Sequence, residues 1–112
     1  MIIKRALISV WDKSGISELG KFLYNNDIEI LSTGGTKKTL EEAGIVTTSI
    51  SFLTGTGSIM DGRVKTLHPK VFGGILADRA NNQHLTDLEG IHGLAIDLVV
   101  VNFYPFFNEA VK

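Results

Sequence analysis

The sequence contains no cysteine, which excludes two classes of protein. A disulfide-stapled domain needs paired cysteines, and a thiolate nucleophile or metal ligand needs at least one. The histidines His68, His84 and His92 lack the spacing of a metal site, and no Ser-His-Asp signature is present. We therefore expect no bound metal and neither a cysteine nor a serine nucleophile.

The sequence also lacks an excess of charge of either sign and a long apolar run. Eleven basic and twelve acidic side chains leave a formal net charge of −1, so no overall field attracts nucleic acid or an anionic membrane. The most apolar stretch, residues 94–107, includes Asp97, Asn102 and Pro105 and falls short of the ~20 residues that span a bilayer. In residues 1–5 the charges are in the wrong order for a signal peptide. We expect a cytoplasmic protein that binds neither nucleic acid nor membrane.

What the sequence does have is enough apolar surface for one core. Of the 112 residues 44% are apolar, and a domain of this size buries roughly two thirds of its unfolded surface. Short apolar runs alternate with segments of helical periodicity, a pattern that predicts an α/β domain with a mostly parallel sheet. The expected strands are residues 6–10, 28–32, 45–50 and 96–103, and we expect the last of them to lie at the centre of the sheet. The expected helices are one that begins at Ile16 and ends at residues 25–27, a second at 37–43 and a third at 69–76. We expect Asp12 or Ser14 to cap the first helix, Gly44 to end the second, and a Gly-rich loop to fill most of residues 54–77.

Three polar segments stand out, each after a predicted strand, and the first is Ser32-Thr-Gly-Gly-Thr36. Glycines let the backbone approach an anion, hydroxyls donate hydrogen bonds, and the following helix adds exposed N–H groups. Lys37 and Lys38 precede Glu41 and Glu42 in that helix, the reverse of the order that the helix dipole prefers. A phosphate bound at the helix N-terminus would explain this order. An ordinary strand-to-helix turn with a Thr cap explains the pentapeptide equally well.

The second segment, residues 62–70, gathers cations in a chain that is otherwise balanced. Arg63 supplies a bidentate fork and Lys65 a point charge, both suited to a phosphate or a developing oxyanion. A solvated charge run is the alternative, although the interleaved apolar residues favour a loop that packs on the body of the protein. His68 taken alone is more often structural than catalytic.

The third segment, Val101-Asn-Phe-Tyr-Pro105, ends the last predicted strand. The amide of Asn102 is able to read a base, and the hydroxyl of Tyr104 is able to donate to an oxyanion. Ordinary core packing is the alternative for this aromatic stretch. The pair Asp12-Lys13 after the first strand is similarly open, because a capping Asp and an exposed Lys would explain it.

Five segments together resemble a known family. They are Ala6-Leu-Ile-Ser-Val-Trp-Asp-Lys-Ser-Gly15, Ile30-Leu-Ser-Thr-Gly-Gly-Thr36, Met60-Asp-Gly-Arg-Val-Lys-Thr-Leu-His-Pro-Lys70, Gly73-Gly-Ile-Leu-Ala77 and Asp97-Leu-Val-Val-Val-Asn-Phe-Tyr-Pro-Phe106. They resemble the inosine monophosphate cyclohydrolase domain that stands at the N-terminus of bifunctional purine biosynthesis proteins, which also carry an aminoimidazole carboxamide ribonucleotide transformylase. The resemblance implies a methylglyoxal-synthase-like fold, a Rossmann-like three-layer α/β unit with a parallel sheet, over residues 1–112 and without the transformylase domain.

The implied reaction closes the pyrimidine ring of a purine. The carboxamide nitrogen of 5-formamidoimidazole-4-carboxamide ribonucleotide attacks the formyl carbon, and water leaves to give inosine monophosphate. This needs a base, charge stabilisation for the carbinolamine oxygen, and an acid for the departing hydroxyl. The resemblance implies no cofactor for this step, since 10-formyltetrahydrofolate serves the transformylase. It also implies a purine nucleotide monophosphate as the substrate and a homodimer for the full-length protein.

The resemblance also assigns site residues. Lys65 matches the cation that stabilises the oxyanion, Tyr104 a catalytic side chain near the formyl group, and Asn102 a position that contacts the base. The other matched substrate-binding positions are Lys13, Thr33, Gly34, Gly35 and Thr36 around the 5′-phosphate, Arg63, Val64 and Thr66 in the covering loop, and also Asp12 and Val101. The family places a further catalytic Asp and Lys beyond Lys112, so we expect this chain alone to turn over poorly.

The sequence departs from the family pattern at several positions. Trp11 stands where a small hydroxyl residue is common, Phe72 where His is usual, and Gly57-Ser58 where Pro-Glu is usual. Two other functions remain open: a methylglyoxal-synthase-type lyase of the same fold, and a regulatory nucleotide- or phosphate-binding module. A regulatory module would need the phosphate loop but not Lys65 together with Tyr104.

Overall fold

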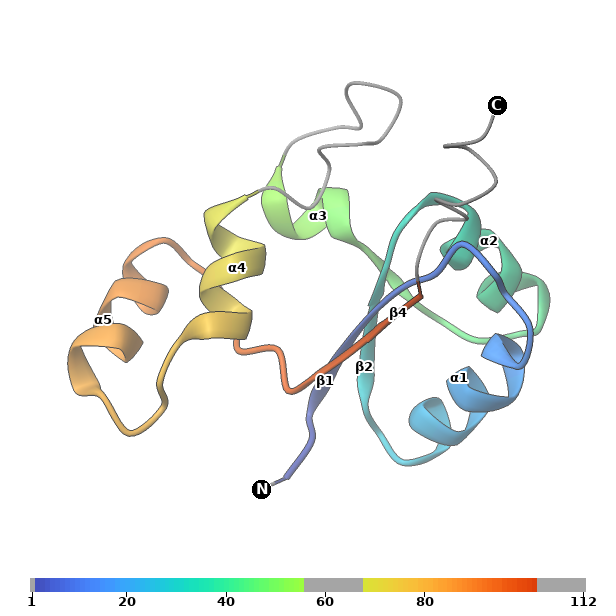
Figure 1. Ribbon diagram of the computed structural model, residues 1–112, viewed down its shortest axis with the longest axis horizontal. Coiled ribbons are helices and arrows are strands. Elements are labelled where there is room, and N and C mark those ends of the chain that lie inside the picture. Colours follow the sequence, from blue (N-terminus) through green and yellow to red (C-terminus); the bar gives the residue numbers. More distant parts are fainter. Residues whose placement is uncertain (1, 56–67, 103–112) are drawn as a thin grey trace, which may run out of the picture.

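The computed structural model describes residues 2–55 and 68–102 (Figure 1). Its centre is a four-stranded sheet in which every neighbouring pair of strands is parallel, with the order β3-β2-β1-β4. The strands are β1 (Arg5–Ser9), β2 (Glu29–Ser32), β3 (Thr48–Ser49) and β4 (Leu98–Val101). The helices are α1 (Ile16–Asn25), α2 (Gly34–Glu42), α3 (Ile50–Thr54), α4 (Pro69–Leu76) and α5 (Asn82–Gly90). The predicted α/β architecture with a parallel sheet is confirmed.

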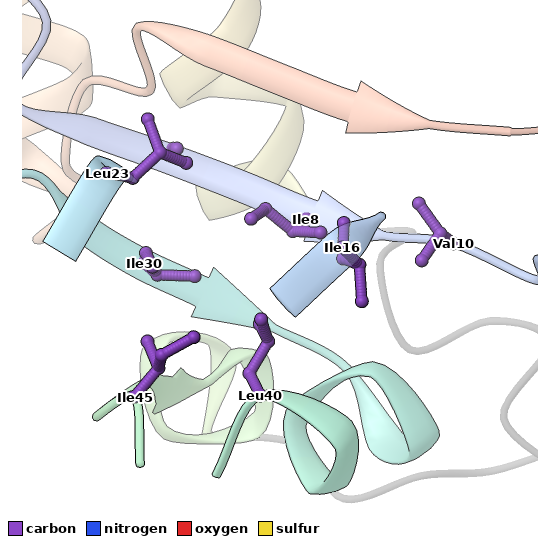
Figure 2. Packing of buried hydrophobic residues seen from close by; sticks show 8 residues of the cluster. Ile8, Val10, Ile16, Leu23, Ile30, Leu40 and Ile45 are labelled. Carbon is purple, nitrogen blue, oxygen red and sulfur yellow. The ribbon is translucent and has the colours of Figure 1, made fainter. Parts of the chain in front are cut away.

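Helices cover both faces of the sheet, so the molecule has three layers (Figure 1). Successive side chains of β1 point to opposite faces, and Ala6, Leu7 and Ile8 are all buried, as a strand covered on both sides requires. One buried cluster joins β1 and β2 to α1 and α2, and Figure 2 shows Ile8 and Ile30 beside the helix residues of this cluster. The second cluster lies between the sheet, α3 and α4 and includes Leu7, Leu31, Ile50, Leu53, Val71 and Ile96.

The ends of α1 and α2 correct two expectations. Gly15, at a positive φ of 74°, precedes α1, and no side chain caps this helix, so the expected cap by Asp12 or Ser14 is wrong. Helix α2 begins at Gly34, three residues before the predicted start, which places the glycines of the polar segment in its first turn. Gly44 adopts a positive φ of 82° after α2, and its predicted role as terminator is confirmed.

Two other predictions were wrong, one for a local reason and one for a reason of tertiary structure. The β-branched run 45–50 contains only two strand residues, because Ile50 starts α3 and the Ser49 hydroxyl accepts the Ser51 N–H there. Strand β4 forms an edge of the described sheet rather than its centre, and Val101 is 63% exposed. An apolar run predicts a strand but contains no information on the order of strands in the sheet.

Helix α4 spans the predicted residues, with Pro69 in its first turn, where a missing N–H costs nothing. Helix α5 was not predicted, although Asn81 gives a recognisable cap signal: its side-chain oxygen accepts the N–H groups of Gln83 and His84. The rest of the predicted Gly-rich loop, residues 56–67, lies outside the described residues. Within residues 2–55 and 68–102, no helix is long and apolar enough to cross a bilayer.

Candidate functional site

Three of the strand ends bring the predicted site residues to one edge of the sheet. Ile8 pairs with Ser32, and Ser9 pairs with Val101, so β1, β2 and β4 end side by side. The chain leaving β1 carries Asp12 and Lys13, and residues 33–36 and Asn102 follow β2 and β4 directly. This is the edge at which open parallel sheets bind ligands.

Lys13 lies across the first turn of α2. Its Cε atom is 3.2 Å and its Nζ atom 3.5 Å from the position that a Cβ of Gly35 would occupy, so a side chain at residue 35 would press on the lysine. The ammonium group donates to the carbonyl oxygens of Val10 and Trp11, at 3.1 Å each. An ammonium has three N–H groups, so these two bonds leave one for a ligand oxygen.

The two threonines of the segment 33–36 use their hydroxyls within the protein. The Thr33 hydroxyl is 2.9 Å from the Ser9 hydroxyl, and the Thr36 hydroxyl accepts the Val10 N–H and donates to the Val10 carbonyl, at 3.2 Å each. Both threonines are buried. An anion here would therefore meet backbone N–H groups of the first turn of α2, which helix geometry leaves without intrahelical partners.

Asn102 binds the loop that follows β1. Its Oδ1 atom accepts the N–H groups of Trp11 at 2.7 Å and Asp12 at 3.1 Å, and its Nδ2 atom donates to the Asp12 carbonyl at 2.6 Å. The predicted contact between Asn102 and a base thus competes with three bonds inside the protein. Val101, the preceding residue, is the last residue of β4.

The carboxylate of Asp12 organises the turn that leads into α1. Its Oδ1 atom accepts the Ser14 hydroxyl at 2.7 Å and the Ser14 N–H at 2.9 Å. These two bonds, with a smaller contribution from the charge of Lys13, hold the pKa of Asp12 below its ordinary value. Asp12 therefore stays ionised beside Lys13 at neutral pH.

The reversed charge order of α2 has an explanation within the protein. Lys37 Nζ donates to the Thr47 carbonyl at 2.8 Å and pairs with Glu41 Oε1 at 2.6 Å. Lys37 thus ties α2 to the chain before β3, and the order of charges no longer requires a phosphate. The features that favour an anion at this helix are the Lys13 ammonium and the backbone N–H groups of its first turn.

The remaining predicted site residues are Arg63, Val64, Lys65, Thr66 and Tyr104, and all of them lie outside the described residues. His68 is described, and it is the N-cap of α4: its Nδ1 atom accepts the Lys70 N–H at 3.1 Å. The interpretation of His68 as structural agrees with this contact. Within the described part of the chain, no group of three or more His, Asp or Glu side chains is placed to hold a metal ion.

Sequence reasoning missed Ser9 and Ser14, whose hydroxyls contact Thr33 and Asp12 at this edge. It also missed a cluster at the opposite edge, where Asp97 accepts the N–H groups of Lys4 and Arg5 and pairs with Arg79. The contact of Ser14 with Asp12 is local, two residues apart, and the sequence analysis considered both only as caps of the first helix. No local pattern signals the contact of Ser9 with Thr33 or the partners of Asp97, because they are far apart in the sequence.

Comparison with known proteins agrees with this architecture. A family model described as "MGS-like domain" matches residues 15–111. The chain is 56% identical over 108 residues to the bifunctional purine biosynthesis protein PurH of Clostridium acetobutylicum, covering 96% of this chain and 22% of that protein. PurH of Clostridium botulinum strain Loch Maree is 55% identical, with the same coverage. The chain thus spans about a fifth of the length of these relatives.

A solved structure extends the likeness to three dimensions. The protein in the crystal structure of ForH is 34% identical and superposes with a TM-score of 0.82, covering 92% of this chain and 54% of that chain. The family model covers most of the sequence, and the three-layer parallel architecture is present in the structure. On these grounds the chain belongs to the MGS-like domain family.

Proposed function

We propose that this chain binds a purine nucleotide monophosphate where β1, β2 and β4 end, and acts in purine biosynthesis as an inosine monophosphate cyclohydrolase domain. Two lines of support meet here. The relatives at 55–56% identity are named as bifunctional purine biosynthesis proteins. The described part of the chain places a lysine ammonium and a helix N-terminus at the edge of the sheet where ligands of such folds bind.

The contact of Lys13 with Gly35 carries the proposal. It places a positive charge over the first turn of α2, at the positive end of the helix dipole, and the absence of a side chain at residue 35 gives that charge its room. Two positive sources at one point favour an anion and disfavour a neutral ligand. A 5′-phosphate is the anion that a nucleotide would present to them.

The proposed chemistry is the dehydrative ring closure of 5-formamidoimidazole-4-carboxamide ribonucleotide. Binding the phosphate at one end and the base at the other holds the carboxamide nitrogen against the formyl carbon, which supplies rate by proximity. Lys65 is the proposed stabiliser of the carbinolamine oxyanion and Tyr104 the proposed donor near the formyl group, with Arg63, Val64 and Thr66 covering the substrate. No metal or organic cofactor takes part in this proposal.

The phosphate site is tested by calorimetry on the 112-residue chain with Lys13→Ala. A charge-assisted contact is worth roughly 1.5–3 kcal/mol, so inosine monophosphate should bind about 10- to 150-fold more weakly and inosine hardly differently. Gly35→Ala should weaken inosine monophosphate in the same direction, because the new Cβ lies 3.2 Å from Lys13 Cε. Gly90→Ala is the matched control, since its Cβ would meet nothing within 4 Å.

Equal losses for nucleotide and nucleoside would contradict the placement of the phosphate. The reaction itself is tested by the formation of inosine monophosphate in a protein that carries the full PurH length, with and without Lys65→Ala. Binding without turnover in that protein would favour a regulatory nucleotide-binding module over an enzyme.

A further inference from the structure

In the loop between β1 and α1, every backbone N–H and carbonyl group of residues 10–12 forms a hydrogen bond with a side chain. Thr36 binds both the N–H and the carbonyl of Val10. Asn102 binds both groups of Asp12 and the N–H of Trp11, and the ammonium of Lys13 binds the carbonyls of Trp11 and Val10. All six backbone polar groups of this loop therefore have side-chain partners, which come from α2, from the end of β4 and from the loop itself.

Asn102 makes three of these bonds and has little capacity left. An amide oxygen has two lone pairs, and Oδ1 accepts from Trp11 and Asp12. An amide nitrogen has two N–H groups, and one donates to Asp12. To form a pair of hydrogen bonds with a base edge, an amide needs a free acceptor and a free donor. Asn102 has only one N–H group left to donate.

The two sides of the loop connect Asn102 with Lys13. The N–H groups of Trp11 and Asp12 face Asn102, while the carbonyls of Val10 and Trp11 face the Lys13 ammonium. Fixing the N–H groups fixes the peptide planes and therefore the directions of the carbonyls, because each peptide unit is planar. The position of the Lys13 ammonium over Gly35 thus depends on the bonds that Asn102 makes.

We infer that Asn102 is a positioning residue, which locks residues 10–12 and thereby holds the Lys13 ammonium over the N-terminus of α2, instead of reading the base of the ligand. The consequence for ligands rests on the proposed function, because it requires a phosphate at Lys13. The consequence for the loop does not. The two are therefore tested separately.

The loop is tested without any ligand, by amide hydrogen exchange and by limited acetylation of lysines. Asn102→Ala should raise exchange at Trp11 and Asp12, and it should raise the acetylation rate of Lys13 relative to Lys21 of α1. Asn102→Asp keeps the side-chain oxygen and should retain most of the protection. Asn26→Ala is the matched control, because the side chain of Asn26 donates to the Phe22 carbonyl within the turn that ends α1, away from residues 10–12. Unchanged exchange at Trp11 and Asp12 in Asn102→Ala would overturn the inference, whatever the ligands do.

The ligand arm compares inosine monophosphate, ribose 5-phosphate and inosine by calorimetry. Asn102→Ala should weaken both phosphorylated ligands by the same factor, about 5- to 50-fold, because the charge-assisted contact of Lys13 with the phosphate is partly lost, and it should leave inosine unchanged. In a protein that already carries Lys13→Ala, Asn102→Ala should change the affinity for inosine monophosphate by less than about 2-fold. The reason is that the effects of two substitutions do not add when one residue acts through the other. A loss for inosine equal to that for inosine monophosphate, with ribose 5-phosphate unaffected, would make Asn102 a base contact and overturn the inference.

If the unsubstituted chain bound neither phosphorylated ligand, the proposed function would fail, and the exchange and acetylation results would still decide the positioning role.

Discussion

Single side chains at the carboxyl edge of the sheet already have partners inside the protein. Lys13, Thr36 and Asn102, which a ligand-binding interpretation selects, bind the backbone of residues 10–12. Such bonds hold the site in one geometry before a ligand arrives, which lowers the entropy that binding must offset. A residue with an internal partner therefore remains a candidate for the site.

His68 provides a test at this scale. Its Nδ1 atom accepts the Lys70 N–H and caps α4. His68→Ala should lower the free energy of unfolding by about 1 kcal/mol, the usual cost of losing a cap, and His68→Asn should restore most of it because Asn supplies an acceptor at the same place. Urea unfolding of the three proteins measures the difference. Equal stability of the Ala and Asn variants would show that the contact does not act as a cap.

At the scale of elements, α4 packs closely against residues 94–96, the segment that leads into β4, and a backbone hydrogen bond joins the two. The Gly74 carbonyl accepts the Ile96 N–H at 3.0 Å, and a Cβ on Gly74 would lie 2.3 Å from the Leu94 carbonyl oxygen. Only glycine permits this approach without a shift of the backbone. Helix α5 lies beyond α4, away from the sheet (Figure 1).

Substituting alanine for the two neighbouring glycines of α4, Gly73 and Gly74, should affect the free energy of unfolding differently. Gly74→Ala should destabilise the protein by about 1–3 kcal/mol, the cost of forcing an extra methyl into a packed contact. Gly73→Ala should be neutral or stabilise by up to about 1 kcal/mol, since its Cβ would meet Leu88 and Ile91 at ordinary distances of 3.5 and 3.8 Å and alanine favours the helix. Thermal and urea unfolding measure both. A Gly74→Ala protein as stable as Gly73→Ala would contradict the close packing.

Across the whole molecule, different groups of residues lie at the carboxyl ends and at the amino ends of the strands. The carboxyl edge holds the candidate site, and the amino edge is closed by Asp97, whose side chain is 5% exposed. Its Oδ2 atom accepts the N–H groups of Lys4 at 2.7 Å and Arg5 at 3.0 Å, and Oδ1 pairs with Arg79 from the connection between α4 and α5. One carboxylate thus joins the beginnings of β1 and β4 to the helical part of the chain.

This carboxylate predicts how stability depends on pH. Desolvation raises the pKa of Asp97, but the hydrogen bonds from Lys4, Arg79 and Arg5 and the charge of Arg79 outweigh it, so the pKa lies below its ordinary value. The stability that Asp97 contributes is therefore fully present above the unfolded pKa of about 3.9, and it is lost as the pH falls through the lower folded pKa. Acid should weaken the protein from about pH 4 downward.

The measurement compares Asp97→Asn with the unsubstituted protein in urea at several pH values. At pH 7 the substitution should cost about 1–3 kcal/mol, because the N–H groups of Lys4 and Arg5 and the Arg79 guanidinium lose a charged acceptor. This difference should shrink below about pH 4. Asp87→Asn is the control, since Asp87 is exposed and accepts a bond from Gln83 one turn away, and it should change stability by less than about 0.5 kcal/mol. A cost that stayed constant from pH 7 to pH 3 would show that ionisation of Asp97 is not its origin.

Local patterns were sufficient for much of the fold. The apolar runs predicted β1 and β2, and Pro69 marked the beginning of α4. The helical spacing of Ile16, Leu19, Phe22 and Leu23 predicted α1, although Phe22 is 63% exposed. The position of β4 at an edge of the described sheet was not predictable in this way, because strand order depends on which surfaces meet in the folded chain. The short β3 and the unexpected α5 are different, since Ser49 and Asn81 give local cap signals that the periodicity alone does not include.

The same division applies to the candidate site. Residue patterns were enough to predict the fold class, the polar segments after the strands and the likeness to a family, because glycines, caps and apolar spacing act on neighbouring residues. The contacts of Lys13, Lys37 and Asn102 follow from the folded chain, since their partners are Gly35, Thr47 and the loop at residues 10–12. Asn102 stands 90 residues after Asp12, and only the pairing of β1 with β4 brings the two together, because parallel strands place their carboxyl ends at one edge.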